Sequence, residues 1–270
     1  MQDPIHLPPD RRMTTVGQDL PTQEQAQSWL ERWDRQQELY IPDRDERFAV
    51  VVDVVAEVLG RPDPLVVDLG IGPGSLAHRL VDRIPQSRIV GVDADPLLAR
   101  LGTIARPDER VRTVLADLRE PGWFDALGLD RAPDAYVSST ALHWLDKEPL
   151  RELLHRCGET IASGGVFVDA DHLYDGHEPT RLDRLGKALT RLRAERVGVL
   201  ANEDWQQWWA AVDAAPELAG LVSERNGGFD HTVTDRPTVH DYLAFLRESG
   251  FGEAGVVWQH GDDRIIAGLA

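Results

Sequence analysis

The chain contains 270 residues, and its 29 basic and 46 acidic side chains give it a formal net charge of −17 at pH 7. Hydrophobic residues make up 42% of the sequence and charged residues 28%, which fits a globular protein and excludes wholesale disorder. No apolar run is long enough to span a membrane, and the acid excess would repel a phosphate backbone. Neither a membrane nor a nucleic acid is therefore expected as a partner.

The N-terminal segment and the cysteine content bear on location. Residues 1–20 are rich in proline and polar side chains and lack an apolar secretory core, which predicts a flexible tail and no signal peptide. Cys157 is the single cysteine, so a disulfide framework and a cysteine-based zinc site are excluded. We expect a cytoplasmic monomer or homodimer that acts on a small molecule and binds no metal.

Two helical patterns precede the main fold. In residues 22–39 the apolar positions Ala26, Trp29, Leu30 and Trp33 recur at helical spacing. A second helical pattern follows Pro42 and ends at Gly60 and Pro62, the usual order of residues at a helix C-terminus. Residues 21–61 are predicted to form a helical lid.

Strand and helix patterns then alternate. The strand patterns cover residues 65–69, 88–93, 111–115, 135–139 and 165–169, and the helical patterns cover 75–84, a segment from 96, and 150–161. Nearly continuous apolar strands separated by helices predict a doubly wound, mostly parallel α/β sheet. Two further strands at 255–259 and 265–269 predict an antiparallel C-terminal hairpin, which brings the sheet to seven strands.

One stretch is too long for this pattern. Residues 172–251 place 80 positions between the fifth strand and the hairpin, whereas a helical crossover needs roughly 30. The stretch carries helical patterns at 181–196 and 204–214. We predict that 172–251 form a helical cap for substrate, inserted into a core made of residues 62–171 and 252–270.

The strongest local signal is a glycine-rich turn after the first strand. Residues 66–75 read Val-Val-Asp-Leu-Gly-Ile-Gly-Pro-Gly-Ser, so a strand leads through Gly70, Gly72 and Gly74 into a helix. Glycines let a ligand approach the backbone closely, and the free N–H groups of the helix N-terminus suit an anionic ligand group. A ligand site at this turn is expected.

The G-x-G-x-G spacing, with an acid two residues before it, resembles the first motif of the class I S-adenosylmethionine-dependent methyltransferases. The resemblance extends in detail over residues 65–173. It implies a Rossmann-like methyltransferase fold, with S-adenosylmethionine as the cofactor. The cofactor-binding residues that it implies are Asp68, Gly70, Gly72, Gly74, Asp93, Ala94, Asp117, Leu118 and Ser138. Among these, Asp93 would accept hydrogen bonds from the ribose hydroxyls, while Asp117 and Leu118 would contact the adenine.

The segment at 133–139 departs from one branch of that family. It lacks the Asn/Asp-Pro-Pro-Tyr/Phe pattern of enzymes that methylate amide or nucleobase nitrogens. This departure agrees with the charge in disfavouring a nucleic-acid substrate.

Candidate catalytic and substrate residues follow the fourth and fifth strands. His143 is the candidate general base, because histidine titrates near neutrality and this one follows the fourth strand; a structural hydrogen bond beside Trp144 is the alternative. The candidate substrate-binding residues are Tyr40, Trp144, His172 and Tyr174. Residues 169–178 concentrate carboxylates and imidazoles, which favours a solvated acidic loop over a Mg²⁺ site.

Two sets of side chains, a pair of arginines and the tryptophans of the predicted cap, each allow two interpretations. Arg44 and Arg47 would pair either with the methionine carboxylate of the cofactor or with their neighbours Asp43 and Glu46. The tryptophans of the predicted cap would either line an acceptor pocket or pack the cap onto the sheet, and packing is favoured; they are Trp205, Trp208 and Trp209.

The sequence thus predicts methyl transfer to a small-molecule acceptor in secondary metabolism, with oxygen preferred over nitrogen or carbon as the acceptor atom. One alternative is a protein of the same fold that does not methylate but catalyses cyclisation, elimination or hydrolysis. Another is a non-catalytic partner subunit. A nicotinamide dehydrogenase is disfavoured by the glycine spacing and the hairpin end.

Overall fold

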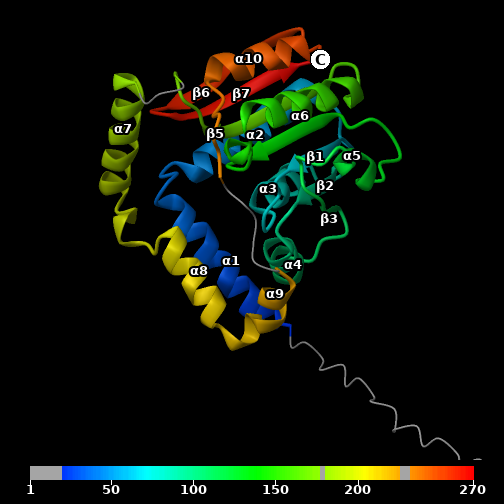
Figure 1. Cartoon of the computed structure of the whole chain (residues 1–270). Helices are drawn as coiled ribbons and strands as arrows, with labels where there is room; N and C mark the ends of the chain where they lie inside the picture. Colours follow the sequence, from blue (N-terminus) through cyan, green and yellow to red (C-terminus); the bar gives the residue numbers. More distant parts are fainter. Residues whose placement is uncertain (1–19, 177–179, 226–231) are drawn as a thin grey trace, which may run out of the picture.

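The computed structural model describes residues 20–176, 180–225 and 232–270, and its centre is a seven-stranded sheet (Figure 1). The strand order is β3-β2-β1-β4-β5-β7-β6. The strands are β1 (Leu65–Leu69), β2 (Arg88–Asp93), β3 (Val111–Leu115), β4 (Ala135–Ser139), β5 (Val166–His172), β6 (Glu253–His260) and β7 (Asp263–Leu269). β1 to β5 pair in parallel, and β7 runs antiparallel to both of its neighbours. The predicted fold class is confirmed.

The central strands are apolar because the sheet is covered on both faces. All five residues of β1 are buried, and so are the first four of β4. β5 continues to His172, three residues beyond its predicted end, because Asp169 to His172 pair with β7 from Ile266 to Asp263. The strand order reverses between β1 and β4, and in such sheets the reversal opens a crevice at the carboxyl ends of the strands.

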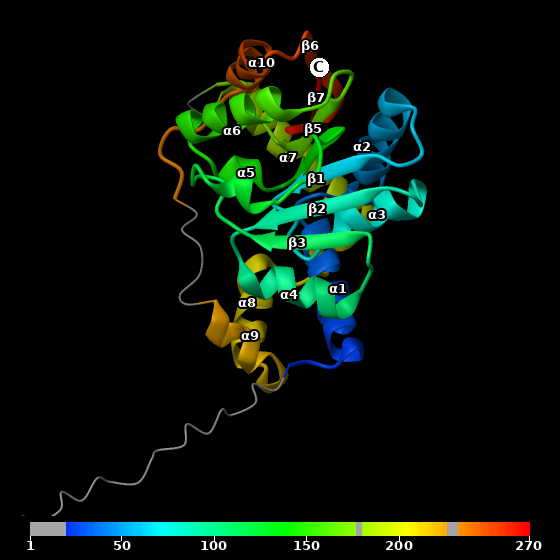
Figure 2. The ribbon, with the colours of Figure 1, turned by 90° about the vertical axis from the view of Figure 1, so that its right-hand side faces the viewer.

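Helices from different parts of the chain form the two covering layers (Figure 2). The layer on one face contains α2 (Arg44–Leu59), α3 (Ser75–Arg83) and α4 (Pro96–Ala105). The layer on the other face contains α5 (Trp123–Ala126), α6 (Lys147–Thr160) and α10 (Val239–Glu248). α10 lies within the predicted cap but packs against α6 and the sheet, since Tyr242, Phe245 and Leu246 join the core there. That part of 172–251 therefore belongs structurally to the sheet layers.

A separate small core joins the N-terminal helix to the helices of the insertion. α1 (Gln23–Glu38) packs against α4 and against α8 (Trp205–Ala214), and α9 (Ala219–Glu224) packs against α4. Trp29, Trp33 and Trp208 are buried together with Leu97 and Leu101 of α4. The lower part of the molecule in Figure 1 thus brings together α1, α4 and the α8–α9 segment, which lie far apart in the sequence.

The longest helix of the insertion, α7 (Arg181–Val197), stands at the side of the sheet (Figure 1). Arg193 reaches Asp43 at the start of α2 at 2.7 Å, and the same carboxylate accepts a hydrogen bond from Nδ1 of His260 at 2.7 Å. Thr190 donates to Asp262 in the turn of the hairpin at 3.1 Å. α7 is thereby attached to both α2 and the hairpin. No helix in the described ranges combines the length and apolar character needed to cross a bilayer.

Candidate functional site

A cavity of about 430 Å³ opens at the carboxyl ends of the strands, beneath α1 and α8. The described residues that line it from the strand ends and following loops include Asp68, Gly70, Gly72, Asp93, Ala94, Asp117, Leu118, His143, Trp144 and His172. Those that line it from the helices include Trp33, Tyr40, Arg44, Phe48, Trp205 and Trp209. Most of the predicted site residues therefore share one cavity.

The glycine turn is held in a conformation that other residues adopt with strain. Gly70, Gly72 and Gly74 have φ angles of 74°, 52° and 87°. A Cβ on Gly70 would lie 2.2 Å from Cβ of Ala141, so the loop after β4 crosses this turn at a distance that only glycine allows. A Cβ on Gly72 would meet nothing within 4 Å, because this glycine faces the cavity. Gly74 caps α3 and lies outside the cavity lining.

Asp93 closes the turn from the end of β2. Its two carboxylate oxygens accept hydrogen bonds from the backbone N–H groups of Gly72 at 2.7 Å and Asp95 at 2.8 Å. Burial raises the pKa of Asp93 to about 6 despite these bonds. A carboxylate offers about four acceptor positions, so Asp93 retains capacity for two ligand hydroxyl groups. The arrangement fits the ribose of the expected cofactor.

Asp68, at the end of β1, has an incomplete set of partners. Its Oδ2 atom is buried without a hydrogen-bond partner, which is a costly state for a carboxylate. Burial, and next the charge of Asp93, raise the pKa of Asp68 to about 8. A cationic ligand group would relieve both effects, and the ammonium of S-adenosylmethionine supplies one. The orphaned oxygen therefore fits this cofactor.

The remaining predicted cofactor residues differ in their placement. Asp117 lines the cavity after β3 and forms an ion pair with Arg119 at 2.7 Å, and Leu118 lines the cavity beside it. Ser138 is fully buried, and its Oγ donates to the carbonyl of Leu69 at 2.8 Å. Strand alternation turns Ser138 into the sheet, so the neighbouring Ser139 lines the cavity in its place. A direct cofactor contact by the Ser138 side chain is not supported.

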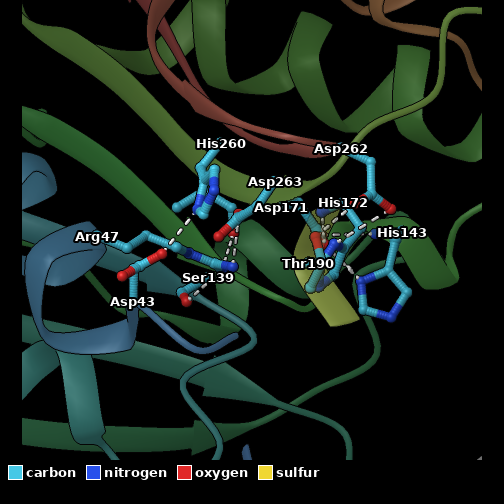
Figure 3. Close-up of polar contacts among 11 residues, drawn as sticks. Asp43, Arg47, Ser139, His143, Asp171, His172, Thr190, His260, Asp262 and Asp263 are labelled. Carbon is cyan, nitrogen blue, oxygen red and sulfur yellow. Dashed lines mark hydrogen bonds and ion pairs between the residues drawn. The ribbon is translucent and has the colours of Figure 1, made fainter. Parts of the chain in front are cut away.

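His143 is oriented by a buried carboxylate (Figure 3). Nδ1 of His143 lies 2.8 Å from Oδ1 of Asp171, which is fully buried in β5. Burial opposes ionisation of Asp171, but the charge and hydrogen bond of His143, followed by the charge of Arg47, keep its pKa below the usual value. An ionised Asp171 accepts a hydrogen bond from the Nδ1–H group, which leaves Nε2 of a neutral imidazole as a proton acceptor. His143 also lines the cavity, so this geometry suits a general base.

The acidic segment after β5 differs from its prediction as a solvated loop. Asp169 and Asp171 are fully buried strand residues, because β7 pairs with this part of β5. Tyr242 donates to Asp169 at 2.8 Å, and Asp171 also accepts the backbone N–H groups of His143 and His172. In the described part of the chain, no three His, Cys, Asp or Glu side chains are grouped to hold a metal. His177 and Glu178, in the same acidic segment, lie outside the described residues.

His172 and Tyr174, the two other predicted substrate residues of this region, lie in different surroundings. His172 lines the cavity, and Nδ1 lies 3.6 Å from Asp262. Burial lowers the pKa of His172, but Asp262 and Asp263 outweigh it, so the pKa lies above the usual value. Tyr174 is placed away from the cavity: its ring lies under the cationic groups of Lys187 and Arg236. A substrate contact by Tyr174 is therefore not supported.

The two arginines of α2 find distant partners. Arg44 lines the cavity and binds Asp34 of α1 at 2.6 Å. Arg47 is fully buried; it binds Asp263 at 2.9 Å and donates to Ser139 Oγ at 2.9 Å and to a backbone carbonyl of β5 (Figure 3). The predicted local pairs with Asp43 and Glu46 are therefore not the ones formed. Sequence spacing gave no signal for partners that the fold brings together.

Tryptophans of α1 and α8 form one wall of the cavity. Trp33 and Trp205 line it with their ring centroids 5.4 Å apart, and Trp209 lines it 5.7 Å from Trp205. Trp208 is fully buried behind them, 4.9 Å from both Trp33 and Trp209. The favoured prediction of packing holds for Trp208, whereas Trp205 and Trp209 both pack and face the cavity.

Thr140 was missed by the sequence analysis. It lines the cavity between β4 and His143 with a φ of 52°, a left-handed conformation that costs a residue other than glycine roughly 1–2 kcal/mol. Its N–H donates to the carbonyl of Ala170 at 3.0 Å, which holds the strained turn in place. Threonine has no preference for this conformation, so the sequence contained no signal for it.

Comparisons with known proteins bear on the core of this site. A family model described as a methyltransferase domain matches residues 66–165. The trans-aconitate 2-methyltransferase of Azoarcus sp. strain BH72 is 37% identical over 138 residues, 50% of this chain and 49% of that protein. The 3-amino-4-hydroxybenzoate 4-O-methyltransferase of Streptomyces cremeus is 32% identical over 114 residues, 40% of this chain and 29% of that protein. The chain thus matches about half the length of the first relative, and less of the second.

A solved structure supports the fold over a longer range. An O-methyltransferase family protein from Burkholderia thailandensis superposes with a TM-score of 0.55 at 17% sequence identity, covering 92% of this chain and 62% of that one. At this identity the likeness concerns the fold alone. The family match begins in β1 and ends just before β5, and the glycine turn lies within it, so this part of the chain is similar to the methyltransferase domains of class I S-adenosylmethionine-dependent enzymes.

Proposed function

We propose that this protein transfers the methyl group of S-adenosylmethionine to a hydroxyl oxygen of a small-molecule acceptor. The observation that carries the proposal is the His143–Asp171 pair, with Nδ1 of the imidazole 2.8 Å from the carboxylate and the ring lining the cofactor cavity. A hydroxyl acceptor arrives protonated and needs a base at this place, whereas a group that is already anionic does not.

The cofactor is held by the strand ends in this proposal. Asp93 accepts from the ribose hydroxyls, Asp68 binds the ammonium, and Asp117 and Leu118 contact the adenine edge and face. Gly72 leaves room for the cofactor against the backbone. When bound, S-adenosylmethionine supplies an electrophilic methyl group on a sulfonium, which any correctly aligned nucleophile displaces in line.

His143 removes the hydroxyl proton in the proposed reaction. As the C–O bond forms, the S–CH₃ bond breaks, its electron pair stays on sulfur, and the hydroxyl proton moves to Nε2 of His143. Asp171 then stabilises the imidazolium through Nδ1, and Arg47 helps to keep Asp171 ionised. Asp171 and Arg47 are thus positioning residues in this proposal, and His143 is the catalytic one.

The acceptor is proposed to bind beside His143, against Trp144, His172 and Tyr40, which line the same cavity. The net charge of −17 supports a small molecule over a nucleic acid, because the chain would repel phosphates. The single cysteine supports a cytoplasmic location. A role in secondary metabolism stays a prediction, and so does a monomeric or homodimeric state.

The test combines cofactor binding with product detection. Calorimetry with S-adenosylhomocysteine should show binding, and incubation with labelled S-adenosylmethionine and a metabolite extract should yield a labelled methyl ether. His143→Gln should lower the transfer rate by about 10²- to 10⁴-fold while S-adenosylhomocysteine still binds. His155→Gln serves as the matched control, because His155 lies exposed on α6 and should leave the rate unchanged. Absence of S-adenosylhomocysteine binding would refute the proposal, and so would an unchanged rate for His143→Gln.

A further inference from the structure

The positive charges around the cavity are already neutralised. Among the described residues that line it, the basic side chains are Arg44, His143 and His172, and each has its own carboxylate partner. The pairs are Arg44–Asp34 at 2.6 Å, His143–Asp171 at 2.8 Å and His172–Asp262 at 3.6 Å. Among the described lining residues, an acceptor carboxylate would therefore meet no basic side chain that lacks a carboxylate beside it.

Of the acidic side chains that line the cavity, only some are paired with a basic side chain among the described residues. Asp95 and Asp117 pair with Arg225 and Arg119, both at 2.7 Å. Asp68 has a buried oxygen without a hydrogen-bond partner, and Asp93 accepts hydrogen bonds from the backbone N–H groups of Gly72 and Asp95. Once the ammonium of the cofactor has ionised Asp68, the surplus charge of the side chains that line the cavity is negative, which opposes a polyanionic acceptor.

The cavity also presents an aromatic surface. Six aromatic side chains line it, two of them on α8, which lies outside the range matched by the family model. They are Trp33, Tyr40, Phe48, Trp144, Trp205 and Trp209. Trp208 fixes the rings of Trp33 and Trp209 from behind at 4.9 Å. Preordered rings of this kind bind planar aromatic molecules with little loss of side-chain entropy.

We infer that the acceptor is an uncharged aromatic alcohol, whose ring lies against the tryptophan wall and whose hydroxyl group meets His143. The inference rests on the proposed methyl transfer and adds the class of substrate. It sets this chain apart from relatives named for trans-aconitate, a tricarboxylate that needs cations for binding and no base for methylation. The family model matches residues 66–165, which include the glycine turn, while α8 with Trp205 and Trp209 lies outside that match.

The inference is tested with two ligands that share a ring system and differ in charge. 2-Naphthol and 2-naphthoate are titrated by calorimetry into the full chain saturated with S-adenosylhomocysteine. 2-Naphthol should bind about tenfold more tightly or better, and labelled S-adenosylmethionine should convert it to 2-methoxynaphthalene. Trans-aconitate should be neither bound nor methylated.

A substitution that frees one cation reverses this preference. Asp34→Asn keeps the shape of its side chain but removes the charge that neutralises Arg44, so the affinity for 2-naphthoate should rise about tenfold while that for 2-naphthol stays within twofold. Asp45→Asn is the matched control. It removes a carboxylate from Arg79, outside the cavity lining, and should change neither affinity.

The failure of this inference is distinguishable from that of the proposed function. If S-adenosylhomocysteine does not bind, the methyltransferase proposal itself fails. If it binds but 2-naphthoate or trans-aconitate binds as well as 2-naphthol, the uncharged acceptor is refuted while methyl transfer stands. If S-adenosylhomocysteine binds and neither naphthalene does, the aromatic part of the inference is refuted. A methylated 2-naphthol together with the Asp34→Asn shift supports the inference in full.

Discussion

Arg47 of α2 and Asp263 of β7 form a buried ion pair across the carboxyl edge of the sheet, with Nη1 2.9 Å from Oδ1. Both side chains are almost fully inaccessible. The same guanidinium donates to Ser139 Oγ and to the carbonyl of Ala170, so one side chain of α2 contacts residues of three strands. This pair holds α2 against the part of the sheet that presents His143.

Removing Arg47 should therefore destabilise the whole molecule. Arg47→Met leaves Asp263 buried without its partner, a situation that costs about 3–5 kcal/mol of unfolding free energy. Urea denaturation measures the loss. Arg83→Met is the control, since Arg83 and Asp53 are exposed and 4.0 Å apart, and it should change stability by less than about 0.5 kcal/mol. A loss below about 1 kcal/mol for Arg47→Met would contradict the role given to this pair.

The parts of this molecule that were predictable from sequence are those set by local chemistry. Apolar runs such as 65–69 identified strands because a parallel sheet is buried on both faces, and the glycine spacing identified the cofactor turn. Asp93 ends β2 and is implied by the resemblance to methyltransferases, while His143 is a candidate because it follows β4; both line one cavity because the carboxyl ends of parallel strands meet at one edge.

The hydrogen-bond and ion-pair partners that come from distant segments could not be predicted from the sequence. Asp171 belongs to an acidic run that predicts a solvated loop, because no local sequence feature shows that β7 buries this residue. Arg44 and Arg47 were considered beside Asp43 and Glu46, whereas the fold supplies Asp34 and Asp263. These pairings depend on where α1 and β7 lie, which is a property of the assembled sheet and lid.

The glycine turn allows a comparison between two positions of equal backbone strain. Gly72 and Gly60 have φ angles of 52° and 55°, and a Cβ at either would meet nothing within 4 Å. Alanine should therefore cost a similar 1 kcal/mol or so at both. Gly72 faces the cavity and Gly60 ends α2 outside it, so only Gly72→Ala should weaken S-adenosylhomocysteine binding, by about tenfold or more. Equal affinities in calorimetry would remove Gly72 from the cofactor site.

Asp171→Asn separates positioning from simple structural support. The amide cannot stabilise an imidazolium as a carboxylate does, so kcat should fall about 10²-fold while the KM for S-adenosylmethionine changes little. Asp171→Glu should restore part of the rate. If Asp171→Asn loses folding and activity together and Asp171→Glu restores the fold without the rate, Asp171 has a structural role alone.

Asp68 should make the free protein less stable as the pH rises. Its folded pKa of about 8 lies above the ordinary value of 3.8, so between these values the folded chain holds a proton that the unfolded chain has released. Its contribution to the unfolding free energy is therefore fully present below pH 4 and is lost progressively up to pH 8. Asp68→Asn removes this loss, and the variant should be more stable than wild type by a few kcal/mol at pH 8 but not at pH 4. Urea unfolding at the two pH values measures the difference.

Asp68 should release its proton when the cofactor binds, and this release can be measured. At pH 7 Asp68 is largely protonated in the free protein, because its pKa is about 8, and an ammonium placed beside it favours the carboxylate. Binding of S-adenosylhomocysteine at pH 7 should therefore release close to one proton, and at pH 9 close to none. Calorimetry in phosphate and in Tris measures the release, because the two buffers differ in ionisation enthalpy. Asp68→Asn should bind more weakly and release no proton from this site, whereas an identical release in the variant would assign the proton to another group.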